Sequence, residues 1–439
     1  MIEVWADIGG TFTDCLVNRK TDTTSDQVSL KVLSSGLVSA DVVSSAGEQE
    51  ILVRMPSRLV HDGFWVGADL IDLGGQRLGR ITACRLRPQN QVSSEHRVGQ
   101  ERTEVLLQLD RPHGLTNDHD SSLTLTLDAG LEAPVLATRL LLRVSLDAPL
   151  PQLQVRLGTT RGTNALLTRS GADVALLITD GFGDLLSIGT QDRPQLFDLD
   201  IVKPKPLPRR VIEVPGRMSA DGVELIAIDE DLLRERLTAL RESNDCPEVL
   251  AICLLHSYRS DAHERIAERI AREVGFDRVV RSTRVAALPR IVPRAETTTL
   301  DAYLQPVLED YVERVATQFG GPESCHLRWM TSSGNLVASD GFHGRESVLS
   351  GPAGGVVALA NIARKLNLNG AVGLDMGGTS TDVSRFDGEI GRRQESQIGG
   401  IRVLSPMMDI HTVAAGGGSI CRCQDGRLYV GPESAGANP

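Results

Sequence analysis

The sequence has few aromatic residues and no excess of positive charge. Phe, Trp and Tyr make up 3% of its 439 residues, so aliphatic side chains must fill the interior. Asp and Glu number 57 against 46 Lys and Arg, which gives a net charge of −11. Such a balance argues against a general nucleic-acid binder, which usually carries a basic face. It does not exclude a small anionic ligand, because backbone amides can bind phosphate without net positive charge.

Long apolar runs and a secretion signal are also missing. No run reaches the roughly 20 residues needed to span a bilayer, and the first residues, Met-Ile-Glu-Val-Trp, include no basic region ahead of an apolar core. The seven Cys form no dense framework, which suits a reducing compartment. Cys421 and Cys423 have no second pair at zinc-finger spacing. We therefore expect a cytoplasmic protein with no membrane partner and no structural zinc.

The length of the chain and the change in its pattern of apolar residues along the sequence predict several domains. Residues 41–150 contain short apolar runs separated by Gly, Asn, Asp and Pro, which predicts a mostly β insert, more typical of a docking or oligomerisation module than of a catalytic one. Helices and strands alternate after residue 155, which is typical of an α/β fold. We predict boundaries at 1–40, 41–150, 151–205, 206–350 and 351–439. The final Gly-Pro-Glu-Ser-Ala-Gly-Ala-Asn-Pro closes no element, so we expect the native chain to continue.

Local patterns predict individual elements. Residues 2–8 and 12–17 are expected to pair as a hairpin around Gly9-Gly10, and residues 174–179 and 248–255 to form buried strands. The periodic segment 260–275 predicts a helix in which Asp261 and Glu264 form a capping box. Gly275 is expected to end this helix and His263 to lie in solvent.

One octapeptide pattern occurs twice. It reads Asp7-Ile-Gly-Gly-Thr-Phe-Thr-Asp14 and Asp375-Met-Gly-Gly-Thr-Ser-Thr-Asp382, identical at six of eight positions, and each copy follows an apolar strand. Two glycines at a hairpin tip permit positive φ and leave successive N–H groups facing an anion. Threonine hydroxyls add donors, and the aspartates could hold Mg²⁺ or orient a nucleophile. A single copy could be an ordinary turn, but two copies predict two related lobes that bind one nucleotide in the cleft between them.

Two further glycine-rich segments flank the second copy. The run Ser350-Gly-Pro-Ala-Gly-Gly opens a predicted helix, whose first N–H groups and positive dipole end favour an anion. The run Gly416-Gly-Gly418 follows His411 and could lie flat against a nucleoside. Either run could also be a plain loop.

The paired Asp-x-Gly-Gly-Thr hairpins resemble the actin, sugar kinase and Hsp70 superfamily, in which two ribonuclease-H-like lobes bind ATP. Further segments narrow this resemblance to the hydantoinase A and oxoprolinase family: Gly158-Thr-Thr-Arg-Gly-Thr-Asn-Ala-Leu-Leu, Thr179-Asp-Gly-Phe-Gly-Asp, Ile291-Val-Pro-Arg-Ala-Glu-Thr, Leu349-Ser-Gly-Pro-Ala-Gly-Gly and Val430-Gly-Pro-Glu-Ser-Ala-Gly-Ala. The resemblance covers most of 1–36 and 155–439. The sequence departs from many relatives at Leu157, where they carry His, and at Ser332-Ser-Gly-Asn, where they show a Gly-Gly pair.

The resemblance implies an ATP-dependent cyclic-amide hydrolase with Mg²⁺, and the details are most similar to the 5-oxoprolinase branch, which converts 5-oxo-L-proline to L-glutamate through phosphorylation of the amide carbonyl oxygen. N-methylhydantoinase and an ATP-dependent ketone carboxylase subunit are the alternatives within the family. A non-enzymatic actin-like nucleotide-binding module is a third. The implied partners are a hydantoinase B-like second half, fused or separate, and further copies of the chain in a homo-oligomer.

Site residues follow from the motifs and the resemblance together. The expected catalytic residues are Asp7, Asp375 and His411, and both aspartates are also expected to hold the metal ion. The predicted nucleotide ligands are Gly9, Gly10, Thr11, Thr13, Gly354, Gly355, Gly377, Gly378, Thr379, Gly416, Gly417 and Gly418. The predicted substrate ligands are Thr159, Thr160, Asn164 and Arg193, with Arg193 pairing with a substrate carboxylate. A surface ion pair is the alternative for Arg193, and a buried structural role is the alternative for His411.

Overall fold

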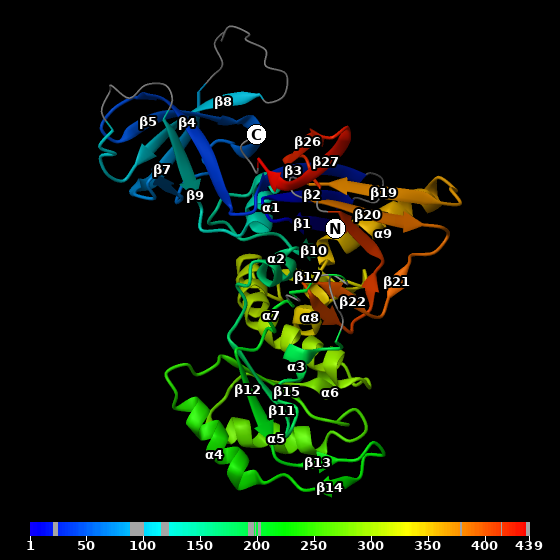
Figure 1. The fold of residues 1–439 in the computed structure, drawn as a ribbon. Helices are drawn as coiled ribbons and strands as arrows, with labels where there is room; N and C mark the ends of the chain where they lie inside the picture. The colour runs from blue at the N-terminus through cyan, green and yellow to red at the C-terminus, as the bar shows by residue number, and fades with distance from the viewer. Residues whose placement is uncertain are drawn as a thin grey trace. The chain divides into compact units, whose positions relative to one another are not determined.

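The computed structural model describes residues 1–20, 25–87, 101–115, 123–191, 197, 199–200, 203–377, 380–413 and 415–435. The chain folds as a mixture of α-helices and β-sheets (Figure 1). It divides into two compact units, which are treated separately below. Unit 1 contains residues 1–159 and 311–329, and unit 2 contains residues 160–310 and 330–439. Within the described residues, no helix combines the length and the apolar character required to cross a membrane.

The main sheet of unit 1 carries the first hairpin. β1 (Ile2–Ile8) pairs antiparallel with β2 (Phe12–Lys20), and β2 pairs antiparallel with β3 (Ser25–Leu33). On its other side β1 lies parallel to β10 (Leu153–Thr159), which lies parallel to β17 (Cys325–Met330). Helix α1 (Ala133–Leu142) covers β2 and β3. The predicted strands at 2–8 and 12–17 are confirmed.

The β-rich insert is a closed six-stranded barrel with the strand order β4-β5-β8-β7-β6-β9. Alternating apolar residues point inward, because side chains alternate between the faces of a strand; Ile51, Val53 and Met55 on β5 are fully buried. Trp65 is also fully buried and its indole N–H donates to Leu59 O at 3.0 Å. The strands are β4 (Leu37–Ser45), β5 (Glu50–Pro56), β6 (Asp69–Ile71), β7 (Arg77–Leu86), β8 (Arg102–Leu109) and β9 (Thr124–Asp128).

A four-stranded parallel sheet organises the first part of unit 2. Its order is β12-β11-β15-β16, with β11 (Val174–Thr179), β12 (Arg210–Val214), β15 (Val249–Cys253) and β16 (Val279–Arg281). Every residue of β11 and β15 is buried, as expected for central strands of a parallel sheet. Helices α4 (Glu230–Arg241) and α5 (Ala262–Val274) pack beside them (Figure 1). The strand predictions at 174–179 and 248–255 are confirmed, the second with tighter bounds.

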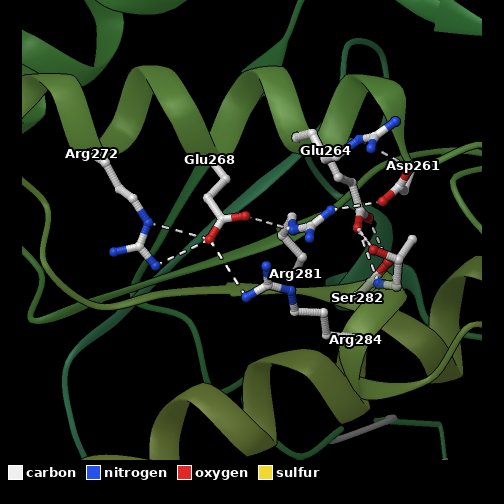
Figure 2. Close-up of polar contacts among 9 residues, drawn as sticks. Asp261, Glu264, Glu268, Arg272, Arg281, Ser282 and Arg284 are labelled. Carbon is white, nitrogen blue, oxygen red and sulfur yellow. Dashed lines mark hydrogen bonds and ion pairs between the residues drawn. The ribbon is translucent and has the colours of Figure 1, made fainter.

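Two details predicted for α5 are wrong. Gly275 ends the helix with φ 102°, as expected, and Asp261 occupies the N-cap position, but its side chain makes no capping hydrogen bond. Glu264 is fully buried and accepts a hydrogen bond from Ser282 Oγ (Figure 2). It also accepts one from Leu254 N at 3.1 Å. His263 is 3% exposed and bonds Glu224 at 2.7 Å. Tertiary partners far along the chain therefore override the local capping preference.

The last part of unit 2 contains the second hairpin. β19 (Ala371–Met376), β20 (Thr381–Phe386) and β25 (Ile410–Val413) form an antiparallel sheet in that order. Helix α9 (Ser350–Lys365) packs against it through Ala360 and Ala363, which contact Phe386. The remaining elements include α2 (Arg161–Leu167), α3 (Leu185–Ile188), β13 (Arg217–Met218), β14 (Glu224–Ile226), α6 (Ser282–Val285), α7 (Ile291–Gln318), α8 (Gly344–Ser347), β21 (Arg392–Arg393), β22 (Ser396–Ile398), β23 (Ile401–Val403), β24 (Met407–Met408), β26 (Ser419–Gln424) and β27 (Arg427–Ser434).

Candidate functional site

The described residues of the two octapeptides pair in the same antiparallel register. In unit 1, Asp7 pairs with Asp14 across the ladder, and Gly9 N donates to Phe12 O at 3.0 Å. In unit 2, Asp375 pairs with Asp382, and Gly377 N donates to Ser380 O at 2.9 Å. Equivalent residues therefore close equivalent turns, and the sequence repeat is a structural repeat.

The third strand of each sheet supplies a partner to the last aspartate of each hairpin. Lys31 of β3 pairs with Asp14, and Lys31 Nζ lies 2.9 Å from its carboxylate. Thr412 of β25 pairs with Asp382 and donates to its Oδ1 at 2.6 Å. Both last aspartates are thus engaged within their own sheets.

The tip of the first hairpin presents unused donors. Gly10 and Thr11 are exposed, and their backbone N–H groups make no hydrogen bond to the residues that the structure describes. Ser34 holds this tip from behind: its Oγ donates to Gly9 O at 2.8 Å, and its N donates to Thr11 O at 2.9 Å. An arrangement of free N–H groups at a glycine turn suits a phosphate oxygen.

Thr13 and Ser34 differ from the sequence-based expectation. Thr13, a predicted nucleotide ligand, is fully buried, and its hydroxyl lies 2.9 Å from Ser34 Oγ. The Thr13 side chain therefore supports the turn from its buried side. It could contact a ligand directly only if the tip opened. Ser34 was missed because it lies in the turn after β3, outside the octapeptide, and no local pattern marks it.

The second hairpin contacts the third glycine-rich run. Gly417 N donates to Gly377 O at 2.9 Å, and Thr381 Oγ1 donates to Ala415 O. Gly416–Gly418 thus lies beside the turn that begins at Gly377. Gly378 and Thr379, which complete that turn in the sequence, lie outside the described residues.

Asp375 and His411 lie on opposite faces of their sheet. Asp375 shares a cross-strand row with Asp382 and Thr412, whereas His411 pairs with Val383 in the adjacent row. Because successive side chains of a strand point to opposite faces, the imidazole does not share a face with the Asp375 carboxylate. His411 is also exposed, so the alternative of a buried structural histidine is not supported.

The predicted substrate segment begins next to the first hairpin. Thr159 ends β10, and Thr159 pairs with Ile8 at the end of β1. Its side chain is fully buried, while Asn164 on α2 is exposed and donates to Thr160 Oγ1 at 3.3 Å. Arg193 lies outside the described residues.

Gly354 and Gly355 lie inside α9, at its fifth and sixth residues. Only the first four N–H groups of a helix lack intrahelical acceptors, so the donors at this end belong to the residues before Gly354. No group of three or more His, Cys, Asp or Glu side chains within the described ranges could hold a metal ion.

Comparison with known proteins identifies similar families. The model described as Hydantoinase/oxoprolinase matches residues 294–439, and the model of the Hydantoinase/oxoprolinase N-terminal region matches residues 140–275. The barrel lies outside both matches.

Individual relatives agree with these matches. The 5-oxoprolinase 1 of Arabidopsis thaliana is 41% identical over 304 residues, which are 65% of this chain and 24% of that protein. The caprolactamase subunit alpha of Pseudomonas jessenii is 34% identical over 297 residues, 64% of this chain and 42% of that protein. The chain therefore spans about a quarter of the length of the oxoprolinase that it matches.

Two solved structures share the fold. An ATP-dependent caprolactamase from Pseudomonas jessenii has a TM-score of 0.57 at 32% identity, covering 65% of this chain and 42% of that one. A nucleotide-free acetone carboxylase has a TM-score of 0.64 at 20% identity, covering 99% of this chain and 51% of that one. The latter likeness extends the shared fold to the barrel.

Proposed function

Because the chain belongs to the hydantoinase/oxoprolinase family, we propose that it is the nucleotide-binding part of an enzyme that opens a cyclic amide with cleavage of ATP. The observation that carries the proposal is the pair of equivalent glycine hairpins, one of which presents two unused N–H groups at its tip. Catalysis of phosphoryl transfer consists mainly of positioning and charge stabilisation, which such donors supply.

The proposed substrate is 5-oxo-L-proline and the proposed product is L-glutamate. This choice is supported by the 41% identity to a 5-oxoprolinase, which exceeds the 34% identity to the caprolactamase subunit. A hydantoinase or an ATP-dependent ketone carboxylase subunit is the alternative within the family. The relative called a subunit supports a further proposal, namely that a hydantoinase B-like second half, fused or separate, completes the enzyme.

In the proposed complex, two ribonuclease-H-like lobes bind ATP, and each contributes one hairpin. Gly9, Gly10 and Thr11 bind phosphate oxygens from the first lobe, and Gly377, Gly378 and Thr379 bind them from the second. Gly416–Gly418 face the nucleoside, a role supported by the bond from Gly417 N to Gly377 O. Mg²⁺ would be held by Asp7, Asp375 and the phosphates, where it would neutralise charge on the nucleotide.

The proposed chemistry activates a stable amide. The lactam carbonyl oxygen attacks the γ-phosphorus and ADP leaves. Water adds to the activated carbon, and the ring C–N bond breaks with protonation of the nitrogen. A second water releases phosphate from the resulting acyl phosphate. The chain's own residues hold the γ-phosphate in line with the carbonyl oxygen, and Thr159, Thr160, Asn164 and Arg193 are the proposed substrate contacts.

The proposal is tested by measuring phosphate release from ATP and Mg²⁺ with and without 5-oxo-L-proline, in the longest native form of the protein and in this chain. Stimulation by 5-oxo-L-proline that is lost in Asp7→Asn and in Asp375→Asn supports it. Stimulation only by a hydantoin, or only by a ketone with bicarbonate, assigns a sister activity. Nucleotide binding without stimulated turnover by any of these compounds assigns a non-enzymatic module instead.

A further inference from the structure

The parallel sheet of unit 2 has a topological switch point that the proposed function does not use. The strand order is β12-β11-β15-β16 (Figure 1). β12 pairs with one edge of β11, and β15 pairs with the other edge. The direction of winding therefore reverses between β11 and β15. In open α/β sheets, ligands bind outside the carboxyl ends of the strands at such a point.

The two loops that leave these carboxyl ends are held in fixed positions. Leu255 N donates to Thr179 Oγ1 at 2.8 Å, which joins the loop after β15 to the end of β11. Glu213 accepts from Gly181 N and Gly183 N, both at 2.9 Å, and so fixes the loop after β11. The buried carboxylate of Glu264 accepts from Leu254 N at the base of the second loop. Loops anchored in this way can present side chains with little loss of entropy on binding.

His256 lies at the tip of the second loop in a strained conformation. Its φ is 60°, in the left-handed region that non-glycine residues seldom adopt. Its ring lies 6.2 Å from the ring of Tyr258 in an edge arrangement. Backbone strain of this kind clusters at ligand-binding positions. Asn tolerates the same conformation, which provides a substitution that keeps the loop.

Two arginines meet the same loops without a carboxylate partner. Arg217 lies over the ring of Phe182 at 5.3 Å, and Arg294 lies over the ring of Tyr258 at 5.5 Å. Arg294 is 1% exposed and donates to Leu254 O, to Leu288 O and to Cys253 Sγ. Neither guanidinium forms an ion pair with any described residue.

Burial and two nearby cations act on the imidazole of His256. Burial lowers the pKa of His256, and the charges of Arg217 and Arg294 lower it further. Among the carboxylates near these loops, Glu213 and Glu264 accept backbone or hydroxyl hydrogens, and Asp180 and Asp184 are exposed. Asp261 pairs with Arg281, and Glu224 bonds His263. The imidazole adds an N–H donor beside two cations.

We propose that Arg217, His256, Phe182 and Tyr258, lying over the buried Arg294, form a binding site for a small carboxylate with an apolar body. A guanidinium fork and an N–H donor match the two oxygens of a carboxylate. The two aromatic rings provide contact area for the apolar part, which a bare phosphate lacks. The site depends on the carboxylate and not on an amide, so it does not rest on the proposed function.

Binding of cyclopentanecarboxylate to this chain, measured by isothermal titration without nucleotide, tests the proposal. We expect saturable binding, no binding of the neutral cyclopentanecarboxamide, and much weaker binding of inorganic phosphate. Arg217→Gln should weaken carboxylate binding by about tenfold, because a charge-assisted hydrogen bond contributes roughly 1.5–3 kcal/mol and each 1.4 kcal/mol is tenfold. His256→Asn should also weaken it while keeping the loop conformation.

Arg209→Gln is the matched control. Arg209 precedes β12 at the opposite end of the same sheet, where it pairs with Asp173 at 3.0 Å, and its loss should leave binding unchanged. The site is refuted if Arg217→Gln and His256→Asn, with wild-type unfolding midpoints, bind as tightly as the wild type, or if phosphate binds as tightly as the carboxylate. Because no nucleotide turnover enters the measurement, its result is independent of the phosphate-release assay.

Discussion

Gly162 lies within the substrate-like motif, but its environment gives it a packing role. A Cβ added at this position would lie 2.0 Å from Ser347 Oγ and 2.9 Å from Ser347 Cβ. Carbon atoms in contact prefer about 3.5–4.0 Å. Rotating the Ser347 hydroxyl would relieve the first overlap but not the second. Helix α2 and helix α8 must therefore separate if Gly162 becomes alanine.

Gly162→Ala is consequently expected to destabilise the chain. Overpacking of this kind costs about 1–3 kcal/mol, whereas alanine in place of glycine within a helix contributes roughly 1 kcal/mol in the other direction. The net expectation is a loss of up to about 2 kcal/mol. Gly355→Ala is the matched control, because Gly355 is exposed on α9 and an added Cβ meets nothing within 4 Å. That variant should be slightly more stable than the wild type.

Urea unfolding followed by circular dichroism measures the stability of both variants. Their unfolding midpoints can be compared directly when the slopes of the transitions are equal. Adding Ser347→Gly to Gly162→Ala removes the overlapping atoms, and the two changes should couple by about 1 kcal/mol or more. A Gly162→Ala variant that is at least as stable as the wild type would show that α2 and α8 do not pack as described. If the two changes do not couple, the steric explanation is contradicted, but the packing of α2 against α8 is not.

Three other predictions follow from burial and charge. Arg281→Met should destabilise unit 2 by about 1–3 kcal/mol in the same urea assay, because Glu268, 12% exposed, loses the partner 2.7 Å away and keeps only Arg272 and Arg284 among the described cations (Figure 2); an unchanged midpoint would contradict this. His411→Asn should leave stimulated phosphate release unchanged, since His411 faces away from Asp375, and a tenfold loss would restore its catalytic role. The pKa of Glu3 is lowered chiefly by its hydrogen bond to Lys20 from the ordinary value of 4.5. The free energy of unfolding of the wild type should therefore exceed that of Glu3→Gln by its full amount above pH 4.5. This difference should shrink as the pH falls below 4.5, and a pH-independent difference would refute the prediction.

The sequence alone determined the features that depend on neighbouring residues. The hairpins at Asp7–Asp14 and Asp375–Asp382 were predictable because paired glycines and flanking apolar strands specify a turn locally. Buried strands such as β11 were predictable because an unbroken apolar run between turn signals suits a strand covered on both faces.

Tertiary structure decided which polar groups meet across distant parts of the chain. Glu264 has the spacing of a capping residue, but its carboxylate binds Ser282 Oγ, 18 residues away. Ser34 supports a turn formed by Gly9, 25 residues earlier, and Gly162 is required by Ser347 and not by its own backbone. Such partners are chosen by burial, since a polar group removed from water must find a hydrogen bond wherever the fold provides one. That choice depends on long-range packing, which no local sequence pattern records.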